Sequence, residues 1–288
     1  MTKTLYGFEA SIWSAVTELA VAELGYKDGD VTFKVVKVVE GENFAPCLCE
    51  SRVEQNPAAT IPVLESDGKV YTSTASVVAC LVKDAPVKVK AGTAAIIETI
   101  HQQQYDPNFA LFLTRDEAEM TAKRTALPGT FQALPMTFLA NRQQLLEKYT
   151  HEPDSDMAPY KALYEAKLAE NTGMRAVFTG TATASEQAAY FAASQAHFET
   201  VKKAVFEVFP AFLPEGGFIG GSVPGEDDFH AGAWFTRIAA IFGATTADEG
   251  VTALEKAYGA PVPVKVAAYW EAWTGRASWK KVYAKWLH

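Results

Sequence analysis

The sequence predicts an α/β domain at the N-terminus followed by an all-α C-terminal domain. Up to residue 82, stretches rich in β-branched residues alternate with apolar-periodic stretches, in the order strand, helix, strand, helix, strand, strand, helix. After Thr93 the strand signals fade and helical periodicity dominates. With 288 residues, of which 49% are hydrophobic, the chain is long and apolar enough to bury a large core in one or two domains.

Local patterns justify the N-terminal elements in turn. Residues 4–16 predict a strand, a loop and a helix, and the β-branched run 31–38 predicts a second strand. Asp67-Gly68 lies between two apolar pairs, which is a strong signal for a hairpin. Ser73 or Thr74 can then cap the next helix. This order of elements fits a thioredoxin-like α/β domain.

A polar stretch from Lys83 to Gly92 predicts a linker, and helices follow it. Pro135 should kink or break the helix in which it falls, and Pro210 should end a long Ala-rich one. The helices are expected at residues 93–104, 131–149, 156–169, 185–209, 227–242, 251–258, 264–274 and 278–287.

Composition narrows the class of protein. The net charge is −8 and Lys and Arg are scattered, which argues against nucleic acid as a partner. No apolar run approaches the ~20 residues of a membrane span, and no secretory signal is recognisable, so we expect a cytoplasmic protein without a membrane partner. Neither the three cysteines (Cys47, Cys49 and Cys80) nor the five histidines are spaced as metal ligands, so no metal is expected.

The segment from Asn56 to Leu81 could hold a peptide-like ligand. A cis Ile61-Pro62 bond would expose the backbone groups of Ile61 to an added strand, although trans is the commoner isomer. A helix that begins at Ser73 or Thr74 would offer free N–H groups to an anion. Either feature alone has a plain structural explanation, and it is their order along the chain that favours a binding site.

These residues resemble the N-terminal domain of the cytosolic glutathione transferases. The chain keeps the family pattern at Asn56, Pro57, Ile61, Pro62, Leu64, Gly68 and Leu81. It departs from the pattern at Ala59, Ser73, Thr74, Ser76 and Cys80. Ser73 stands where the family has an acidic residue for the ammonium of glutathione, so the charge-assisted part of that contact is missing.

The chain start resembles the serine-type classes of this family, in which a serine at the position of Ser11 opens the first helix. The resemblance implies that Ser11 is catalytic and donates a hydrogen bond to the glutathione sulfur. Ser14 and Tyr6 are the alternatives, although Ser14 should face the backbone and Tyr6 the core. The implied glutathione-binding residues are Ser11, Trp13, Thr60, Ile61, Pro62, Ser73 and Thr74.

The resemblance also implies a function and a division of labour. Residues 1–83 would bind glutathione as co-substrate, and residues 93–288 would hold a small apolar electrophile, with Phe8, Trp13 and His101 as candidate contacts. The expected protein is a cytoplasmic, homodimeric transferase of detoxification. The alternative is a non-catalytic carrier of hydrophobic ligands or a translation-factor-like interaction module on the same scaffold.

Three further expectations come from the resemblance. Asn43 and Phe44 replace a basic pair for the glycyl carboxylate, for which Arg52 or Gln55 could substitute. Gly225 and Asp228 would begin a central helix through a capping box, so Asp228 would serve folding. Residues 150–186 would be an insertion.

Overall fold

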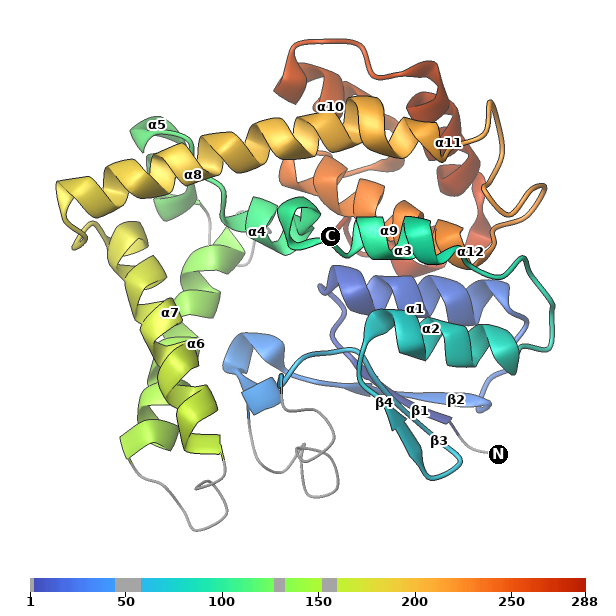
Figure 1. Cartoon of the computed structure of the whole chain (residues 1–288), viewed down its shortest axis with the longest axis horizontal. Coiled ribbons are helices and arrows are strands. Elements are labelled where there is room, and N and C mark those ends of the chain that lie inside the picture. Colours follow the sequence, from blue (N-terminus) through green and yellow to red (C-terminus); the bar gives the residue numbers. More distant parts are fainter. Residues whose placement is uncertain (1–2, 45–57, 127–132, 152–159) are drawn as a thin grey trace. The chain divides into compact units, whose positions relative to one another are not determined.

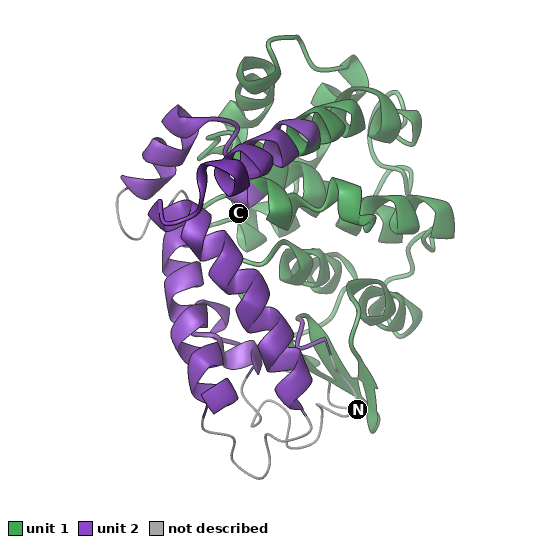
Figure 2. Ribbon diagram, turned by 60° about the vertical axis from the view of Figure 1, so that its left-hand side comes forward, with its two compact units in different colours: residues 1–35, 61–110, 197–288 green, residues 36–60, 111–196 purple. Residues whose placement is uncertain are grey.

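The computed structural model describes residues 3–44, 58–126, 133–151 and 160–288. The chain forms two compact units, coloured separately in Figure 2. Unit 1 comprises residues 1–35, 61–110 and 197–288, and unit 2 comprises residues 36–60 and 111–196. The division into a domain of residues 1–83 and a domain of residues 93–288 stays a prediction.

Unit 1 contains a four-stranded mixed sheet with the order β2-β1-β3-β4. The strands are β1 (Lys3–Gly7), β2 (Val31–Val35), β3 (Val63–Ser66) and β4 (Lys69–Tyr71). β1 pairs parallel with β2 and antiparallel with β3, and β3 pairs antiparallel with β4. Asp67 and Gly68 both have positive φ, 52° and 73°, as the tight turn between β3 and β4 requires. The predicted hairpin is confirmed, and so is the thioredoxin-like α/β class.

The helices of unit 1 surround α9, which is buried along almost its whole length. α9 packs against α1, α3 and α10. Its side chains include Phe229 and Trp234, both fully buried. The helices that lie wholly in this unit are α1 (Ile12–Glu23), α2 (Thr74–Lys83), α3 (Ala94–Ile100), α9 (Glu226–Ile241), α10 (Gly250–Tyr258), α11 (Val264–Gly275) and α12 (Ala277–Val282) (Figure 1).

Unit 2 is helical in its described part. It contains α5 (Glu117–Arg124), α6 (Leu134–His151) and α7 (Lys161–Thr179), and α6 packs along α7. The boundaries between the units fall inside α4 (Pro107–Phe112) and α8 (Ala184–Lys203). The helical second half of the predicted fold class is therefore confirmed, including helices within residues 150–186.

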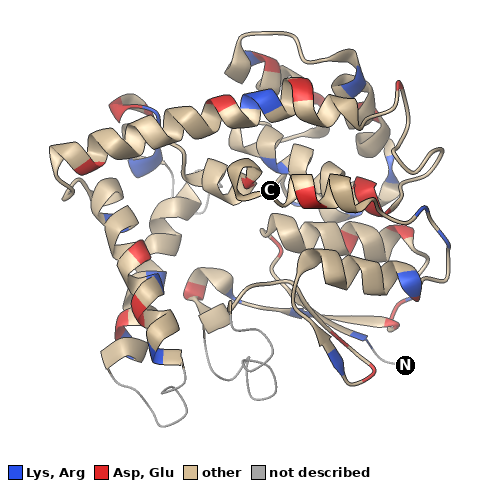
Figure 3. Ribbon diagram, viewed as in Figure 1, with Lys and Arg blue, Asp and Glu red and all other residues tan. Residues whose placement is uncertain are grey.

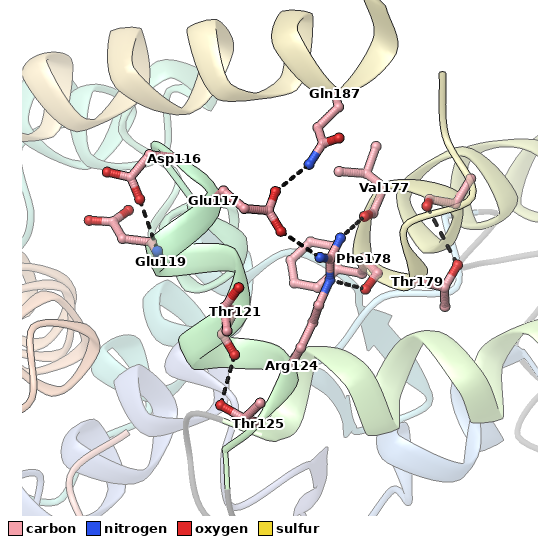
Figure 4. A network of polar contacts seen from close by, with 11 residues as sticks. Asp116, Glu117, Glu119, Thr121, Arg124, Thr125, Val177, Phe178, Thr179 and Gln187 are labelled. Atoms are coloured by element: carbon pink, nitrogen blue, oxygen red, sulfur yellow. Dashed lines mark hydrogen bonds and ion pairs between the residues drawn. The ribbon is translucent and has the colours of Figure 1, made fainter. Parts of the chain in front are cut away.

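Arg124 fastens the C-terminal end of α7 to α5 (Figure 4). Its guanidinium donates to the carbonyl oxygens of Val177 and Phe178, at 2.8 and 2.7 Å, and pairs with Glu117 at 2.8 Å. Gly180 ends α7 in the left-handed conformation, φ 75°. A cation at the last carbonyls of a helix satisfies orphan acceptors and interacts favourably with the helix dipole. This part of the predicted insertion is thus an ordered helical element with its own polar anchoring.

Several element bounds differ from expectation. Pro135 lies in the first turn of α6, where a missing N–H costs nothing, so it neither kinks nor breaks the helix. β2 ends at Val35 because the chain then enters a 3-10 turn at Val38–Glu40. The last predicted helix ends at Val282, and two helices, α4 and α5, are additional to the predicted ones.

The long Ala-rich helix ends before Pro210, not at it. α8 stops at Lys203, and a π-helical turn at Ala204–Val208 and a 3-10 turn at Phe209–Ala211, which contains Pro210, follow it. In Figure 3 basic and acidic residues are both spread along the helices. No helix among the described residues is both long and apolar enough to cross a membrane.

Candidate active site

The sheet brings the predicted site segments to one edge. β1 ends at Gly7, β3 begins at Val63 and β4 ends at Tyr71. The registered pairs are Tyr6 with Val63 and Leu64 with Tyr71. Because β3 runs opposite to both neighbours, its start lies beside the ends of β1 and β4. The loop to Ser11, the Ile61-Pro62 segment and the start of α2 therefore gather at the same edge of unit 1 (Figure 1).

Ser11 is the N-cap of α1. Its backbone is extended, with φ −93° and ψ 121°, and its Oγ accepts a hydrogen bond from the Ser14 N–H at 3.3 Å. The side chain is half-buried, and among the described residues no acceptor takes its hydroxyl proton. Ser11 can thus cap the helix and donate to a ligand atom at the same time.

The alternatives to Ser11 have structural roles, as expected. Ser14 is fully buried, and its Oγ accepts the N–H of Phe8 at 3.0 Å. A side chain at Gly7 would approach that Oγ to 2.9 Å, so the turn needs a glycine there. Tyr6 is buried in β1, and its hydroxyl donates to Glu65 at 3.3 Å. Neither side chain is as available as that of Ser11.

The loop before Ser11 is tied to the central helix. Arg237 of α9, only 1% exposed, donates from Nη2 to the carbonyl oxygen of Ala10 at 2.6 Å. A hydrogen bond from a buried cation to a backbone carbonyl is charge-assisted, and so stronger than a neutral one. Arg237 therefore helps to fix the turn that carries Ser11. Residues 10 and 237 lie too far apart in sequence for any local pattern to have indicated this contact.

The Ile61-Pro62 bond is cis. Ile61 is half-buried and Pro62 is buried, and the proline lies directly before β3. The cis isomer is the one that would expose the backbone groups of Ile61 to an added strand. Thr60 is exposed and belongs to unit 2.

Ser73, rather than Thr74, caps α2. Ser73 and Ser76 form a reciprocal capping box, in which each Oγ accepts the other residue's N–H at 3.2 Å. The two hydroxyl groups also bond to each other at 2.9 Å. Thr74 is 8% exposed. The exposed Ser73 hydroxyl is thus engaged within the protein, and Ser76, a departure from the family pattern, is its partner.

Sequence patterns did not reveal a group of three rings that includes Trp13 in the first turn of α1. The imidazole of His101 stacks on the indole of Trp13, with centroids 4.3 Å apart and planes at 25°. Nε2 of His101 lies 2.9 Å from Nδ1 of His230, which belongs to α9. His101 is half-buried instead of lying free on the surface. Three positions separated by about 90 and 130 residues have no shared local signal.

In unit 2, Asn43 and Phe44 take part in packing. Asn43 donates from Nδ2 to the Ala59 carbonyl at 3.0 Å, and the Tyr164 hydroxyl donates to the Phe44 carbonyl at 2.8 Å. The guanidinium of Arg142 stands 4.7 Å from the centroid of the Phe44 ring. The suggested substitutes Arg52 and Gln55, like Cys47 and Cys49, lie outside the described residues.

Cys80 is buried. Within residues 3–44, 58–126, 133–151 and 160–288, no group of three or more His, Cys, Asp or Glu could hold a metal ion.

Glu18 on α1 gives the stability of the fold a pH dependence. Burial and, as a smaller cause, repulsion from the Glu9 carboxylate together raise its pKa to about 7. The folded protein therefore binds a proton that the unfolded chain releases near pH 4.5. The resulting stabilisation is complete below about pH 4.5 and is lost as pH rises through about 7.

Replacing Glu18 by glutamine removes the ionisation, so at pH 8 the variant should be more stable than the wild type by about 3 kcal/mol. Near pH 4.5 the two should be equal. Urea unfolding across this pH range measures the difference, and the exposed Glu271→Gln is the control. A constant difference at every pH would contradict the explanation.

Comparisons with known proteins identify the N-terminal part. Residues 5–107 match the family model described as the glutathione S-transferase N-terminal domain. No curated protein sequence matches the chain significantly.

The solved structures similar to this chain include glutathione S-transferase III in apo form, with 15% identity over 99% of this chain and 97% of that one, at a TM-score of 0.48. Glutathione transferase F7 from Populus trichocarpa has 15% identity over 97% of each chain, at a TM-score of 0.45. Beta-etherase LigF from Sphingobium sp. strain SYK-6 has 13% identity over 99% of this chain and 100% of that one, at 0.47. The family model carries the assignment for the N-terminal part: residues 5–107 belong to the glutathione S-transferase N-terminal domain family.

Proposed function

We propose that the protein is a glutathione transferase, which joins the thiolate of glutathione to an apolar electrophile. The observation that carries the proposal is the Ser11 hydroxyl at the start of α1, inside the matched domain and with its proton unused among the described residues. The thiolate is the nucleophile, and a free thiol has a pKa near ~8.5. A hydroxyl donor at a helix N-terminus stabilises the anion and so raises its population at neutral pH.

The glutathione peptide would lie along the sheet edge described above. Ile61 and Pro62 would bind its backbone, and Ser73, Thr74 and the first N–H groups of α2 would bind its γ-glutamyl end. Trp13 and Thr60 complete the proposed set. The sulfur of the tripeptide would then face Ser11, and the electrophile would be held by residues of the helical part.

The decisive experiment measures conjugation of glutathione with a generic aromatic halide. Ser11→Ala should lower kcat/KM roughly a hundredfold, equivalent to about 2.7 kcal/mol, because the donor to the developing thiolate is lost. Ser11→Thr keeps a hydroxyl and should retain most of the activity.

Ser11→Asp provides the matched control for folding. It keeps the acceptor that caps α1 but has no hydroxyl donor, so it should be as stable as the wild type and inactive. An inactive wild type, or an Ser11→Ala variant with unchanged kinetics, would refute the proposed function.

A second candidate is a non-catalytic carrier of hydrophobic ligands or a translation-factor-like module. The Ser73 capping box favours it, because the hydroxyl that would meet the glutathione ammonium already bonds to Ser76. Isothermal calorimetry separates the two: no heat with glutathione, together with tight binding of a hydrophobic dye, would favour the carrier.

The proposal extends to the setting of the protein. The family resemblance favours a homodimer that works in the cytoplasm and detoxifies electrophiles. Light scattering on the purified protein measures the mass of the assembly, and fractionation of cells tests the compartment.

A further inference from the structure

The peptide group between Ala10 and Ser11 is held at both of its ends. The Ser11 N–H donates to the Phe8 carbonyl oxygen at 2.9 Å, and the Ala10 carbonyl oxygen accepts from Nη2 of Arg237 at 2.6 Å. Ala10 is only 6% exposed, so water is a poor substitute for the guanidinium. Because the peptide group is planar, its orientation sets the backbone angles on either side of it, and with them the direction of the Ser11 side chain.

The other described hydrogen bonds to the backbone of this turn are local. The Phe8 N–H donates to Oγ of Ser14 at 3.0 Å, six residues further on. The Ser11 carbonyl oxygen accepts from the Ala15 N–H at 2.9 Å, within the first turn of α1. These bonds form wherever α1 lies, so they cannot fix the turn against the rest of the unit. The bond from Arg237 does so, because it comes from the central helix α9.

The guanidinium of Arg237 is a buried charge with defined neighbours inside unit 1. Asp106 lies close enough to act on this charge, and so do Tyr283 and His288 near the C-terminal end of the chain. Burial lowers the pKa of Arg237 to about 10, with Tyr283 and Asp106 acting in the opposite direction, so the group is charged at physiological pH. Burial and, as a smaller cause, the charge of Arg237 lower the pKa of His288 to about 3, so that ring is neutral. A charged donor packed in this way has little freedom to move.

We propose that Arg237 is a positioning residue of the conjugation reaction, and that its hydrogen bond to the Ala10 carbonyl aims the Ser11 hydroxyl at the glutathione sulfur. The inference rests on the proposed function. Arg237 makes no contact with the substrate in this scheme, and it acts through the peptide group that precedes Ser11. A displacement of about 1 Å at a reacting group can cost about a hundredfold in rate, so the orientation of one peptide plane is enough to matter.

Stability of the fold alone is a weak reason for an arginine at this position. Burying a cation is costly, and well-packed apolar residues in place of buried ionic groups are often neutral or stabilising. Arg237 is only 1% exposed, in a helix whose other buried side chains include Phe229 and Trp234. A charge-assisted bond to the turn that carries Ser11 gives the buried charge a role that an apolar side chain could not fill.

A double-mutant cycle tests whether Arg237 acts through Ser11. Arg237→Gln keeps an N–H donor but loses the charge and the reach of the guanidinium, so kcat/KM for glutathione and an aromatic halide should fall about thirtyfold. In the Ser11→Ala background the same substitution should cost less than about threefold, because no hydroxyl remains to be aimed. If Arg237→Gln does not fold, Arg237→Lys in both backgrounds supplies the same cycle. Equal losses in the two backgrounds would overturn the inference.

The thiol of bound glutathione provides a readout that a loss of stability would not move. Its titration, followed by the ultraviolet absorbance of the thiolate, should shift to higher pH in Arg237→Gln, because the donor to the sulfur is misaligned. Arg237→Lys keeps the charge and one donor, and it should recover part of the shift. Leu254→Ala is the control, since Leu254 is 1% exposed in α10 and its truncation destabilises the fold away from the turn. Equal shifts in Arg237→Gln and Leu254→Ala would contradict the positioning role.

A measurement independent of activity separates this inference from the proposed function. Amide hydrogen exchange of the Ser11 N–H should be at least about tenfold faster in Arg237→Gln than in the wild type, because the peptide group is released at its other end. Exchange of the Leu24 N–H, which donates to the Ala20 carbonyl at the far end of α1, should change less than about threefold. A wild type without conjugating activity would refute the proposed function. Unchanged exchange at Ser11 would overturn the role of Arg237 even in an active enzyme.

Discussion

Replacing Asp228 by alanine is expected to lower the free energy of unfolding by about 4 kcal/mol, because the change leaves several buried donors without an acceptor. Asp228 is fully buried at the start of α9. Its Oδ1 accepts the Ile219 N–H at 2.8 Å and the Tyr269 hydroxyl at 2.9 Å, and its Oδ2 accepts the N–H groups of Gly220 at 2.7 Å and Gly225 at 2.8 Å.

The four hydrogen bonds of Asp228 connect the start of α9 to the preceding loop and to α11. The bond to Gly225 closes the capping box of α9, which confirms the predicted folding role of Asp228. The bonds to residues 219 and 220 hold the preceding loop, and the bond to Tyr269 joins α11 to α9. Losing them frees a loop and two helices at once.

Asparagine at this position separates the acceptor function from side-chain volume. An amide is nearly isosteric, but its NH₂ group would face N–H donors on one side, so Asp228→Asn should still lose about 3 kcal/mol. Urea unfolding followed by circular dichroism measures both variants, with Asp248→Ala at an exposed site as the control. If Asp228→Ala proves too unstable to purify, the asparagine variant still tests the point. A loss below about 1 kcal/mol in the asparagine variant would contradict the argument.

Gly232→Ala is expected to destabilise the protein by about 3 kcal/mol, through overpacking against Trp273. Gly232 lies within α9, and a Cβ there would stand 2.5 Å from Nε1 and Cε2 of the Trp273 ring. Trp273 is 2% exposed and also packs against the Phe218 ring, with centroids 5.2 Å apart. The indole therefore has little room to move.

The matched control is Gly173→Ala in α7, where a Cβ would meet no atom within 4 Å. Alanine favours a helix over glycine by about 1 kcal/mol, so this variant should be stabilised by roughly 0.5–1 kcal/mol. The two substitutions are chemically identical and opposite in predicted sign. Stabilisation of Gly232→Ala, measured by thermal and urea unfolding, would show that α9 and α11 can separate without cost.

The sequence predicted the fold well where local chemistry decides the structure. The hairpin at Asp67-Gly68 needed two residues that tolerate positive φ, and the strands and the helices α1 and α2 needed only their periodicities. Between β2 and β3 the described residues form only 3-10 turns, so the helix expected there stays a prediction. The sequence predicted short elements less well. α4 and α5 are six and eight residues long, too short for a clear apolar period.

In the candidate site too, the sequence predicted the features that depend on neighbouring residues and left others undecided. Ser11 and Ser73 were predicted as helix caps, and both cap through a hydrogen bond that spans three residues. The role of Ser76 follows from the same short range, although the family pattern has no hydroxyl there. The isomer of the Ile61-Pro62 bond was undecided by its own sequence, because both isomers are accessible to an X-Pro bond.

The sequence alone thus determined the caps, the turn and the described strands of the sheet, since each depends on contacts or periodicities a few residues apart. Only the tertiary structure decided that His101 meets Trp13 and His230, and that Arg237 reaches the carbonyl of Ala10. These contacts join residues about 90 to 230 positions apart, and the packing of α9 against α1 and α3 brings them together. Packing of whole helices depends on side chains along their full length, so no short motif encodes it.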